Sequence, residues 1–185
     1  MHTNTDEKKK IPLGSGNIYC VPYTGIIPED LEFESEENRL GHISGGASIE
    51  YKPTFYTATD DFRRVSKTVV TDEEATMKFG IITWNLAVLN RLIASGKITE
   101  KDGKRTLKIG GAENQNSDKY LFRFVNKDKV DGDTRVTMLG NNQAGLSLSY
   151  SKDKEVSVNP EIKGEPMADG AIIVIEEEVL TPSGS

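Results

Sequence analysis

In Ala47-Ser48-Ile49-Glu50-Tyr51-Lys52-Pro53-Thr54-Phe55-Tyr56, the odd positions are mostly apolar and the even positions mostly polar. Successive side chains of a strand point to opposite faces of a sheet, so this period of two indicates a strand with one buried and one wet face. A second such run follows Asp60-Asp61. We therefore expect two long strands, over residues 42–58 and 62–82, joined at a charged hairpin tip. Gly45-Gly46 predicts a bulge in the first strand.

Composition limits the size of the core and the kinds of partner. The chain has 185 residues, of which 36% are hydrophobic, and a net charge of −6. This length fits one domain, which we expect over residues 13–180, with flexible ends at 1–12 and 181–185. The core is thin for the length, either because ends and loops are disordered or because neighbouring copies complete the burial. The excess of acidic residues argues against a surface that binds nucleic acid. No apolar run reaches the ~20 residues that span a bilayer.

The remaining segments predict short strands around one helix. Strands are expected over residues 17–23, 120–126, 135–139, 146–150 and 171–175, with glycine-rich turns between several of them and a loop over residues 24–38. A helix is expected over residues 84–94, with Thr83 or Asn85 capping its start and Gly96 following its end. The fold class is therefore mainly β: a β-sandwich or barrel with one flanking α-helix.

The predicted helix has an unusually wide apolar side. On a helical wheel its apolar residues cover about 200°, whereas one core contact needs only ~100° or a little more. Either a neighbouring subunit or a covering loop would explain the excess. The candidates for subunit packing are Trp84, Leu86, Val88, Leu89, Leu92 and Ile93.

Residues that carry out covalent chemistry are scarce. Cys20 is the only cysteine, so no intrachain disulfide is expected, and the histidines are His2 and His42. These are too few for a structural zinc site, and His42 has no nearby signature of a catalytic triad. The aspartates of residues 128–133 lack the closing glutamate of a calcium loop, so they predict a turn. We expect no enzyme, no catalytic residue, no metal site and no cofactor.

The succession of these segments resembles the major tail tube proteins of long-tailed (siphovirus-type) bacteriophages and prophages of Gram-positive bacteria. The resemblance covers roughly the first half of the chain. It lies in residues 13–19 (Leu-Gly-Ser-Gly-Asn-Ile-Tyr), residues 40–51 (Leu-Gly-His-Ile-Ser-Gly-Gly-Ala-Ser-Ile-Glu-Tyr), Asp60-Asp61 and residues 72–85 (Asp-Glu-Glu-Ala-Thr-Met-Lys-Phe-Gly-Ile-Ile-Thr-Trp-Asn).

The resemblance implies a structural virion protein. In that family six copies form a ring, rings stack into a hollow tube through which DNA leaves the capsid, and a long hairpin or loop reaches the next ring. The partners would be further copies of the chain and the tail terminator, tape measure and baseplate proteins, with DNA passing without sticking and no membrane involved. The location would be the virion tail, after synthesis in the cytoplasm of the bacterial host.

The resemblance also suggests where contacts lie. We expect the polar face of the first long strand, Ser48, Glu50, Lys52 and Thr54, to line the bore, although Lys52 departs from a purely anion-repelling wall. The expected contact between rings is the hairpin tip, with the acidic loop over residues 24–38 as the alternative. The tip candidates are Tyr56, Asp60, Asp61, Arg63 and Arg64.

Two other classes of function remain open from the sequence. One is the tube of a contractile tail, a phage-like bacteriocin or a type VI secretion system, which shares the architecture and differs in cargo. The other is a β-sandwich carbohydrate-binding or adhesive module. Such a module needs exposed aromatic side chains arranged as a platform for sugars, whereas aromatic residues here are 7% and fall mostly on apolar faces.

Overall fold

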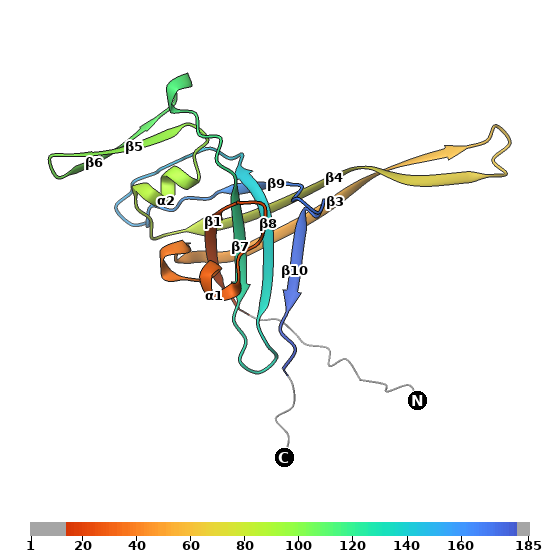
Figure 1. Cartoon of the computed structure of the whole chain (residues 1–185), viewed down its shortest axis with the longest axis horizontal. Coiled ribbons are helices and arrows are strands. Elements are labelled where there is room, and N and C mark those ends of the chain that lie inside the picture. Colours follow the sequence, from red (N-terminus) through yellow and green to blue (C-terminus); the bar gives the residue numbers. More distant parts are fainter. Residues whose placement is uncertain (1–13, 181–185) are drawn as a thin grey trace, which may run out of the picture.

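The computed structural model describes residues 14–180, and in this part the chain is mainly β, as expected (Figure 1). The ends expected to be flexible, residues 1–12 and 181–185, lie outside the described residues. The strands and α-helices are β1 (Asn17–Pro22), α1 (Asp30–Phe33), β2 (Arg39–Gly41), β3 (Ile43–Thr59), β4 (Ser66–Ile81), α2 (Leu86–Arg91), β5 (Gly96–Lys101), β6 (Lys104–Ile109), β7 (Tyr120–Asn126), β8 (Thr134–Asn142), β9 (Glu161–Glu165) and β10 (Ile173–Glu177).

The main sheet closes on itself. Its antiparallel strands follow the order β2-β1-β7-β8-β9-β4-β3, and only His42 separates β2 from β3 in the chain. The two ends of the path are therefore consecutive parts of one strand. At this joint the His42 backbone N–H donates to Thr83 Oγ1 at 2.7 Å, and the Ile82 N–H donates to the His42 carbonyl at 2.9 Å. Closure pairs the strands of this path on both sides within the body, while β10, which lies off the path, pairs only with β8.

Along the edge that faces away from β7, β8 pairs with two different strands in turn. Its first half pairs with β10 and its second half with β9, which leads the sheet on to β4. Gly140 lies where β8 meets β9, and a Cβ placed there would be 2.1 Å from the Lys163 carbonyl oxygen. The two backbones approach so closely that only glycine fits, which fixes the position of β9.

Two apolar clusters lie on the two faces of this sheet. The larger cluster takes side chains from inside the closed sheet, such as Phe122, Met77 and Met138, and from α2. The smaller cluster takes alternate residues of β1, β7 and β8 on the outer face, and Phe33 of α1 lies in it. Burying each large apolar side chain contributes roughly 1.5–3 kcal/mol, so these clusters supply most of the stabilisation.

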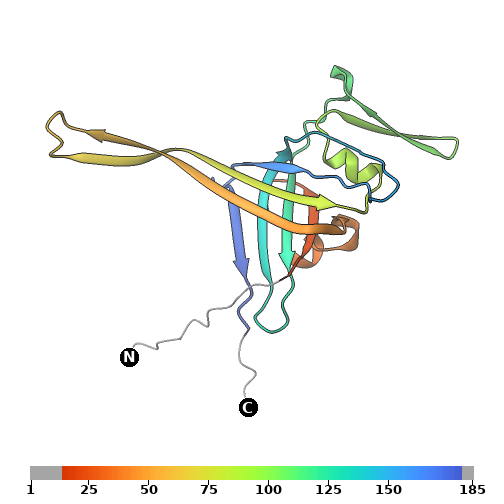
Figure 2. The ribbon, with the colours of Figure 1, turned by 180° about the vertical axis from the view of Figure 1, so that it is seen from behind.

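The hairpin of β3 and β4 extends far beyond the closed body and forms the longest feature of the molecule (Figures 1 and 2). We call its distal part, residues 51–73, the arm. The turn occupies residues 60–65, so β4 begins later than the expected residue 62. The predicted bulge at Gly45-Gly46 is confirmed, because the strand register shifts between Ser44 and Ala47.

Several expected elements differ from those observed. α2 spans six residues and ends before residue 94; Asn85 caps it by accepting a hydrogen bond from the Val88 N–H at 3.0 Å, but Gly96 opens β5. Residues 146–150 form no strand, because Leu146 and Leu148 reach the core from a loop with no pairing partner. The expected loop over residues 24–38 contains α1, so the expectation of a single helix was wrong.

Candidate functional site

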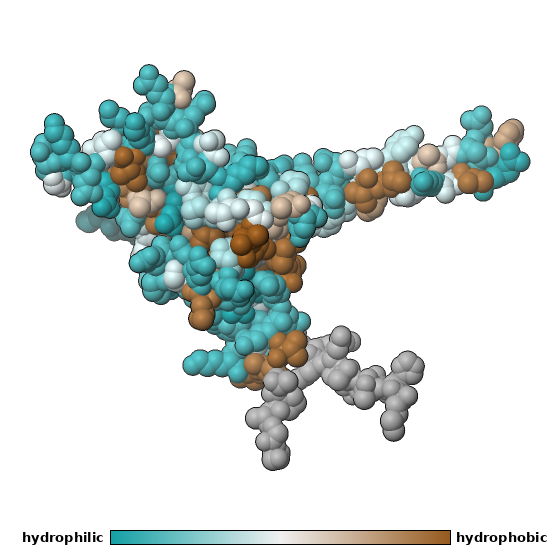
Figure 3. All heavy atoms as spheres, in the orientation of Figure 1, coloured by the Kyte–Doolittle hydropathy of each residue, from teal (hydrophilic) through white to brown (hydrophobic). Residues whose placement is uncertain are grey.

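The arm carries apolar side chains that no other part of the described chain covers (Figure 3). The alternation of β3 buries Ile49 partly against the core, but Tyr51, two residues further, is 50% exposed. Nearer the tip, Phe55 and Tyr56 are 60% and 59% exposed. The alternation in the sequence therefore does give the hairpin an apolar face, but this face continues along the arm beyond the end of the core.

Apolar groups lie on both faces of the arm. Between Thr54 and Phe55 the pairing skips one residue of β4, so that Phe55 lies opposite Val70 and Tyr56 opposite Val69. Directly opposed residues share a face, and neighbouring residues on a strand take opposite faces. One side of the arm thus presents Phe55 with Val70, and the other presents Tyr56 with Val69.

Asp60 organises the tip of the arm. Its Oδ1 accepts hydrogen bonds from the backbone N–H groups of Arg64 and Val65, the latter at 2.9 Å. The Val65 hydrogen bond, supported by those from Arg64, lowers the pKa of the Asp60 carboxyl. The Arg64 guanidinium lies 4.8 Å from the centre of the Phe62 ring. Of the candidates for a contact between rings, Asp60, Asp61, Arg63 and Arg64 therefore lie together at the tip, and Tyr56 lies nearby on β3.

The four candidates for the bore, Ser48, Glu50, Lys52 and Thr54, lie on one exposed face of β3, as the alternation predicts. The face continues across β4 and β9 with charges of both signs. Lys78 pairs with Glu161 at 3.0 Å, and Lys163 pairs with Glu74 at 3.1 Å. The carboxylates of this face are therefore partly neutralised by lysines, and Lys52 is not an isolated exception.

The helix candidates for subunit packing lie in the chain's own core. Val88, Leu89 and Leu92 are buried in the main cluster, and Trp84, Leu86 and Ile93 pack against it. The Trp84 indole N–H donates to the Val156 carbonyl at 3.0 Å, which ties the helix to the loop over residues 143–160. The covering loop thus accounts for much of the wide apolar arc. Because Trp84, Leu86 and Ile93 are only partly buried, the expected subunit contact through the helix stays a prediction.

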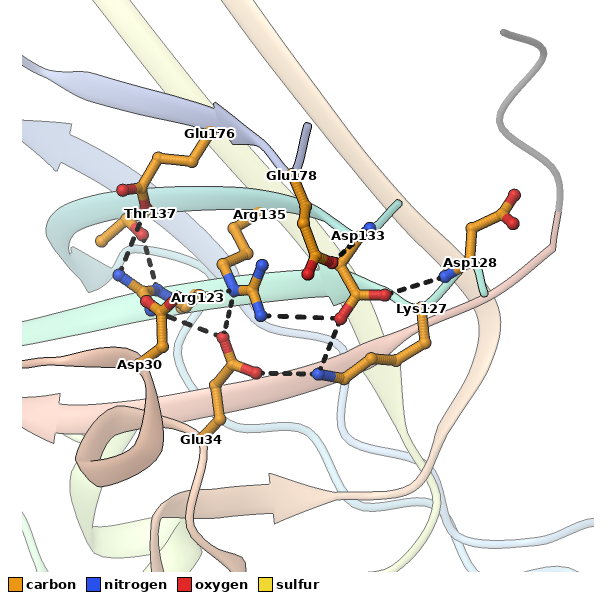
Figure 4. A network of polar contacts seen from close by, with 10 residues as sticks. All are labelled: Asp30, Glu34, Arg123, Lys127, Asp128, Asp133, Arg135, Thr137, Glu176 and Glu178. Atoms are coloured by element: carbon orange, nitrogen blue, oxygen red, sulfur yellow. Dashed lines mark hydrogen bonds and ion pairs between the residues drawn. The ribbon is translucent and has the colours of Figure 1, made fainter. Parts of the chain in front are cut away.

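A buried arginine on β7 holds together elements that are far apart in the sequence (Figure 4). The Arg123 side chain is 1% exposed. Its Nη1 lies 2.6 Å from Asp30 Oδ1 of α1, its Nε donates to Thr137 Oγ1 of β8 at 2.9 Å, and its Nη2 lies 3.4 Å from Glu176 Oε2 of β10. This network fixes α1 on the outer face of the sheet.

The network continues through a second group of charges next to it (Figure 4). Lys127 Nζ lies 3.0 Å from both Glu34 and Asp133, and Glu34 also pairs with Arg135. Burial alone would lower the pKa of Lys127, but its two carboxylate partners outweigh burial and raise it. Burial alone would raise the pKa of Asp133, but the hydrogen bonds from Lys127 and from the Asp128 backbone N–H, together with the charges of Lys127 and Arg135, outweigh burial and lower the pKa.

Sequence reasoning missed this network. The sequence predicts a loop over residues 24–38, although three of its acidic residues, Asp30, Glu34 and Glu36, ion-pair with arginines on the sheet. A signal was present in Leu121-Phe122-Arg123-Phe124-Val125, because a charge inside a strand that is apolar on both faces requires buried partners. The partners themselves are not visible in the sequence, since they lie some ninety positions away.

The aspartates of residues 128–133 form a turn, as expected. Asp128 Oδ1 accepts from the backbone N–H groups of Val130 and Asp131, at 2.8 and 3.0 Å. Among residues 14–180, no group of three or more histidine, cysteine, aspartate or glutamate side chains is placed to hold a metal ion. In the same range, no helix is both long and apolar enough to cross a membrane.

Comparison with protein-family models and with curated proteins finds no match to this chain. Three features of the structure bear on function: the projecting arm, the charged face of β3 and β4 that includes Ser48, Glu50, Lys52 and Thr54, and the charge network of Arg123 under α1.

Proposed function

We propose that this chain is a structural subunit that assembles with copies of itself into hexameric rings stacked as a hollow tube, of the kind that the major tail tube proteins of long-tailed phages form. One observation carries the proposal: the arm exposes apolar side chains on both faces. Soluble monomers rarely leave a contiguous apolar surface uncovered, and a surface of this kind marks a site of protein association. The partner that the proposal assigns is the next copy of the same chain.

The geometry of the strands supports the same proposal. Among the described residues, β4 pairs with β9 only at residues 76–78, and no other strand pairs with the arm. Its two edges therefore offer unpaired N–H and C=O groups, and such edges pair readily with another chain. Joining arms edge to edge would give a continuous sheet around a bore, with closure of the ring removing the last free edge. Such a tube would share the architecture of the phage tail tubes, and the closed body and α2 would lie outside the bore.

The proposal assigns roles to the two candidate surfaces. The exposed face with Ser48, Glu50, Lys52 and Thr54 would line the bore, and the tip around Asp60 would reach the next ring. Mixed charge on that face would let DNA pass without binding, because neighbouring lysines and carboxylates leave no strong field of either sign. The tail terminator, the tape measure protein and the baseplate would meet the tube at its ends and inside it.

Electron microscopy of stained, concentrated protein tests the proposal. Phe55→Ser with Val70→Ser removes one apolar pair from the arm and touches no core residue. The matched control, Val130→Ser with Val179→Ser, removes two exposed apolar side chains outside the arm. We expect tubes or rings from the parent chain and the control, and dispersed particles from the arm variant. Dispersed particles from the parent chain at every concentration, or unchanged tubes from the arm variant, would contradict the proposal.

The same exposed side chains support a second candidate, a carbohydrate-binding or adhesive module. Tyr51 and Phe55 lie on one face of the arm, and exposed aromatic rings on one face are the feature that such a module needs. The Tyr51 hydroxyl donates to a Glu73 carboxylate oxygen, which orients the ring. A glycan-binding screen separates the candidates: binding that Tyr51→Ala with Phe55→Ala abolishes, in a chain that stays monomeric, would favour the module.

A further inference from the structure

A second hairpin, formed by β5 and β6, projects from the body on the side away from the arm (Figures 1 and 2). We call it the ribbon. Asp102 and Gly103 form its two-residue turn with φ values of 53° and 73°, the left-handed conformation that such hairpins require. At its base, Leu107 packs against the main core. The opposite face of the ribbon is open to solvent.

That open face is lined with lysines. Lys97 lies opposite Lys108 and Lys101 opposite Lys104, with Thr99 and Thr106 between them. All of these side chains are exposed, and within residues 14–180 none of the four lysines has an ion-pair partner. Like charges directly opposite each other destabilise an antiparallel pair. The lysine face therefore weakens the hairpin that carries it.

The other face shows that the ribbon also accommodates an opposite-charge pair. There Glu100 lies opposite Arg105, and their charged groups are 2.9 Å apart. The four lysines are thus not required by the hairpin, and an anionic partner would relieve their repulsion. The face would therefore suit an anionic partner that carries carboxylates or phosphates.

The chain itself supplies a matching acidic surface. In residues 29–37, the side chains of Glu29, Glu32 and Glu37 are exposed and have no ion-pair partner in the described part of the chain. Between them Leu31 is 94% exposed. The segment is held rigidly, because Asp30 and Glu34 are fixed by Arg123 and Arg135. It therefore presents its free carboxylates in a defined arrangement.

We infer that the lysine face of the ribbon docks on residues 29–37 of a second copy of this chain. The inference rests on the proposed self-assembly and adds a second contact between neighbouring copies, besides the one through their arms. The two surfaces are different patches of one molecule, and a contact between different patches builds rings when its rotation closes. A protein partner fits better than nucleic acid, because the chain has a net charge of −6 and residues 96–109 contain no aromatic side chain to stack on bases.

The test separates docking from folding. Lys101→Glu with Lys108→Glu turns both lysine pairs into opposite-charge pairs, so the ribbon becomes more stable while its face loses its net charge. We expect the variant to melt at the same or a higher temperature and to need an about tenfold higher concentration to assemble, measured by sedimentation. The control, Lys152→Glu with Lys154→Glu, makes the same change of net charge in an exposed turn and should assemble like the parent chain. Equal assembly of the ribbon variant would overturn the inference.

Carbodiimide cross-linking locates the contact. The experiment uses an equal mixture of ¹⁵N-labelled and unlabelled chains. A cross-linked peptide pair that joins a ribbon lysine to Glu29, Glu32 or Glu37, with one peptide labelled and the other not, shows that the contact is between two copies. If tubes form without such cross-links, only this inference is overturned. If cross-linked particles form but never rings or tubes, the inference is supported and the proposed tube is overturned. Binding of a labelled DNA duplex that is lost in the ribbon variant, with assembly unchanged, would overturn the inference in favour of nucleic acid.

Discussion

The guanidinium carbon of Arg123 lies 4.3 Å from the centre of the Phe33 ring, so that a charged and an aromatic side chain stack beneath α1. Phe33 has no exposed surface, and Arg123 is almost as buried. A buried guanidinium over a ring is attracted by its electron-rich face, and that attraction grows when water is excluded. The pair fixes α1 on the sheet through packing and charge together.

Replacing Arg123 should destabilise the fold strongly. Arg123→Met keeps much of the apolar stem but leaves Asp30 and Glu176 without their shared cation. The carboxylates left behind are about half exposed, so the expected cost is that of the lost charge-assisted hydrogen bonds, about 1.5–3 kcal/mol, which urea unfolding followed by circular dichroism would detect. Arg105→Met is the control, since its pair with Glu100 is exposed and should contribute less than about 1 kcal/mol. Similar unfolding midpoints for the two variants would show that the network does not stabilise α1.

Acid should weaken the protein partly through Asp133. Its pKa is lowered from the ordinary value of 3.8, so its contribution to stability is fully present above that value and is lost as the pH falls through the lower pKa of the folded state. Asp133→Asn removes the titrating group. Between about pH 5 and about pH 2, the free energy of unfolding should therefore fall less steeply in this variant than in the parent chain. The exposed Asp153→Asn is the control and should leave the slope unchanged.

The thiol of Cys20 should be inert in the folded protein. Burial raises its pKa from 9.0 to about 12, so the thiolate fraction near neutral pH falls roughly a thousandfold. We expect Ellman's reagent at about pH 8 to label the native chain far more slowly than the chain in concentrated urea. Equal rates in the two conditions would mean that β1 opens readily and that the main core is not closed.

The two aspartates at the arm tip should behave differently although they are neighbours in the sequence. Asp60→Ala removes the acceptor for the N–H groups of Arg64 and Val65, and amide hydrogen exchange at these positions should speed up. Asp61→Ala is the matched control and should not change exchange there. The free energy of unfolding of the body should be the same in both variants, because the turn is remote from both apolar clusters. A fall in that free energy for Asp60→Ala would mean that the tip and the body fold as one unit.

Local patterns predicted the parts of this fold that local physics controls. The period of two located both long strands, and the side-chain preference of Asn85 located a helix cap. β2 and β9 were missed, because strands of three and five residues are defined by their partners. Glu161–Glu165 contains one buried apolar residue, Ile162, and no alternation long enough to read.

The candidate surfaces were predictable in part. Alternation correctly placed Ser48, Glu50, Lys52 and Thr54 on one face. It could not show that the apolar face continues beyond the core from Tyr51 on, because burial depends on what the rest of the chain covers. The lysine face has a signal that was overlooked. Lys-x-Thr-x-Lys occurs at residues 97–101 and again at 104–108, in mirrored positions around the Asp102-Gly103 turn. Two such repeats across a tight turn must place their lysines opposite one another.

The joint at His42 has a mechanical consequence. β3 passes directly from the closed sheet into the arm, and its other end continues through this single residue into β2. A pull at the tip of the arm draws β3 and β4 outward together, so it loads in shear the hydrogen bonds that hold this hairpin to its neighbours. These join β4 to β9 and, through β2, join the hairpin to β1. A force applied at the tip of the arm is therefore distributed around the strands of the closed sheet.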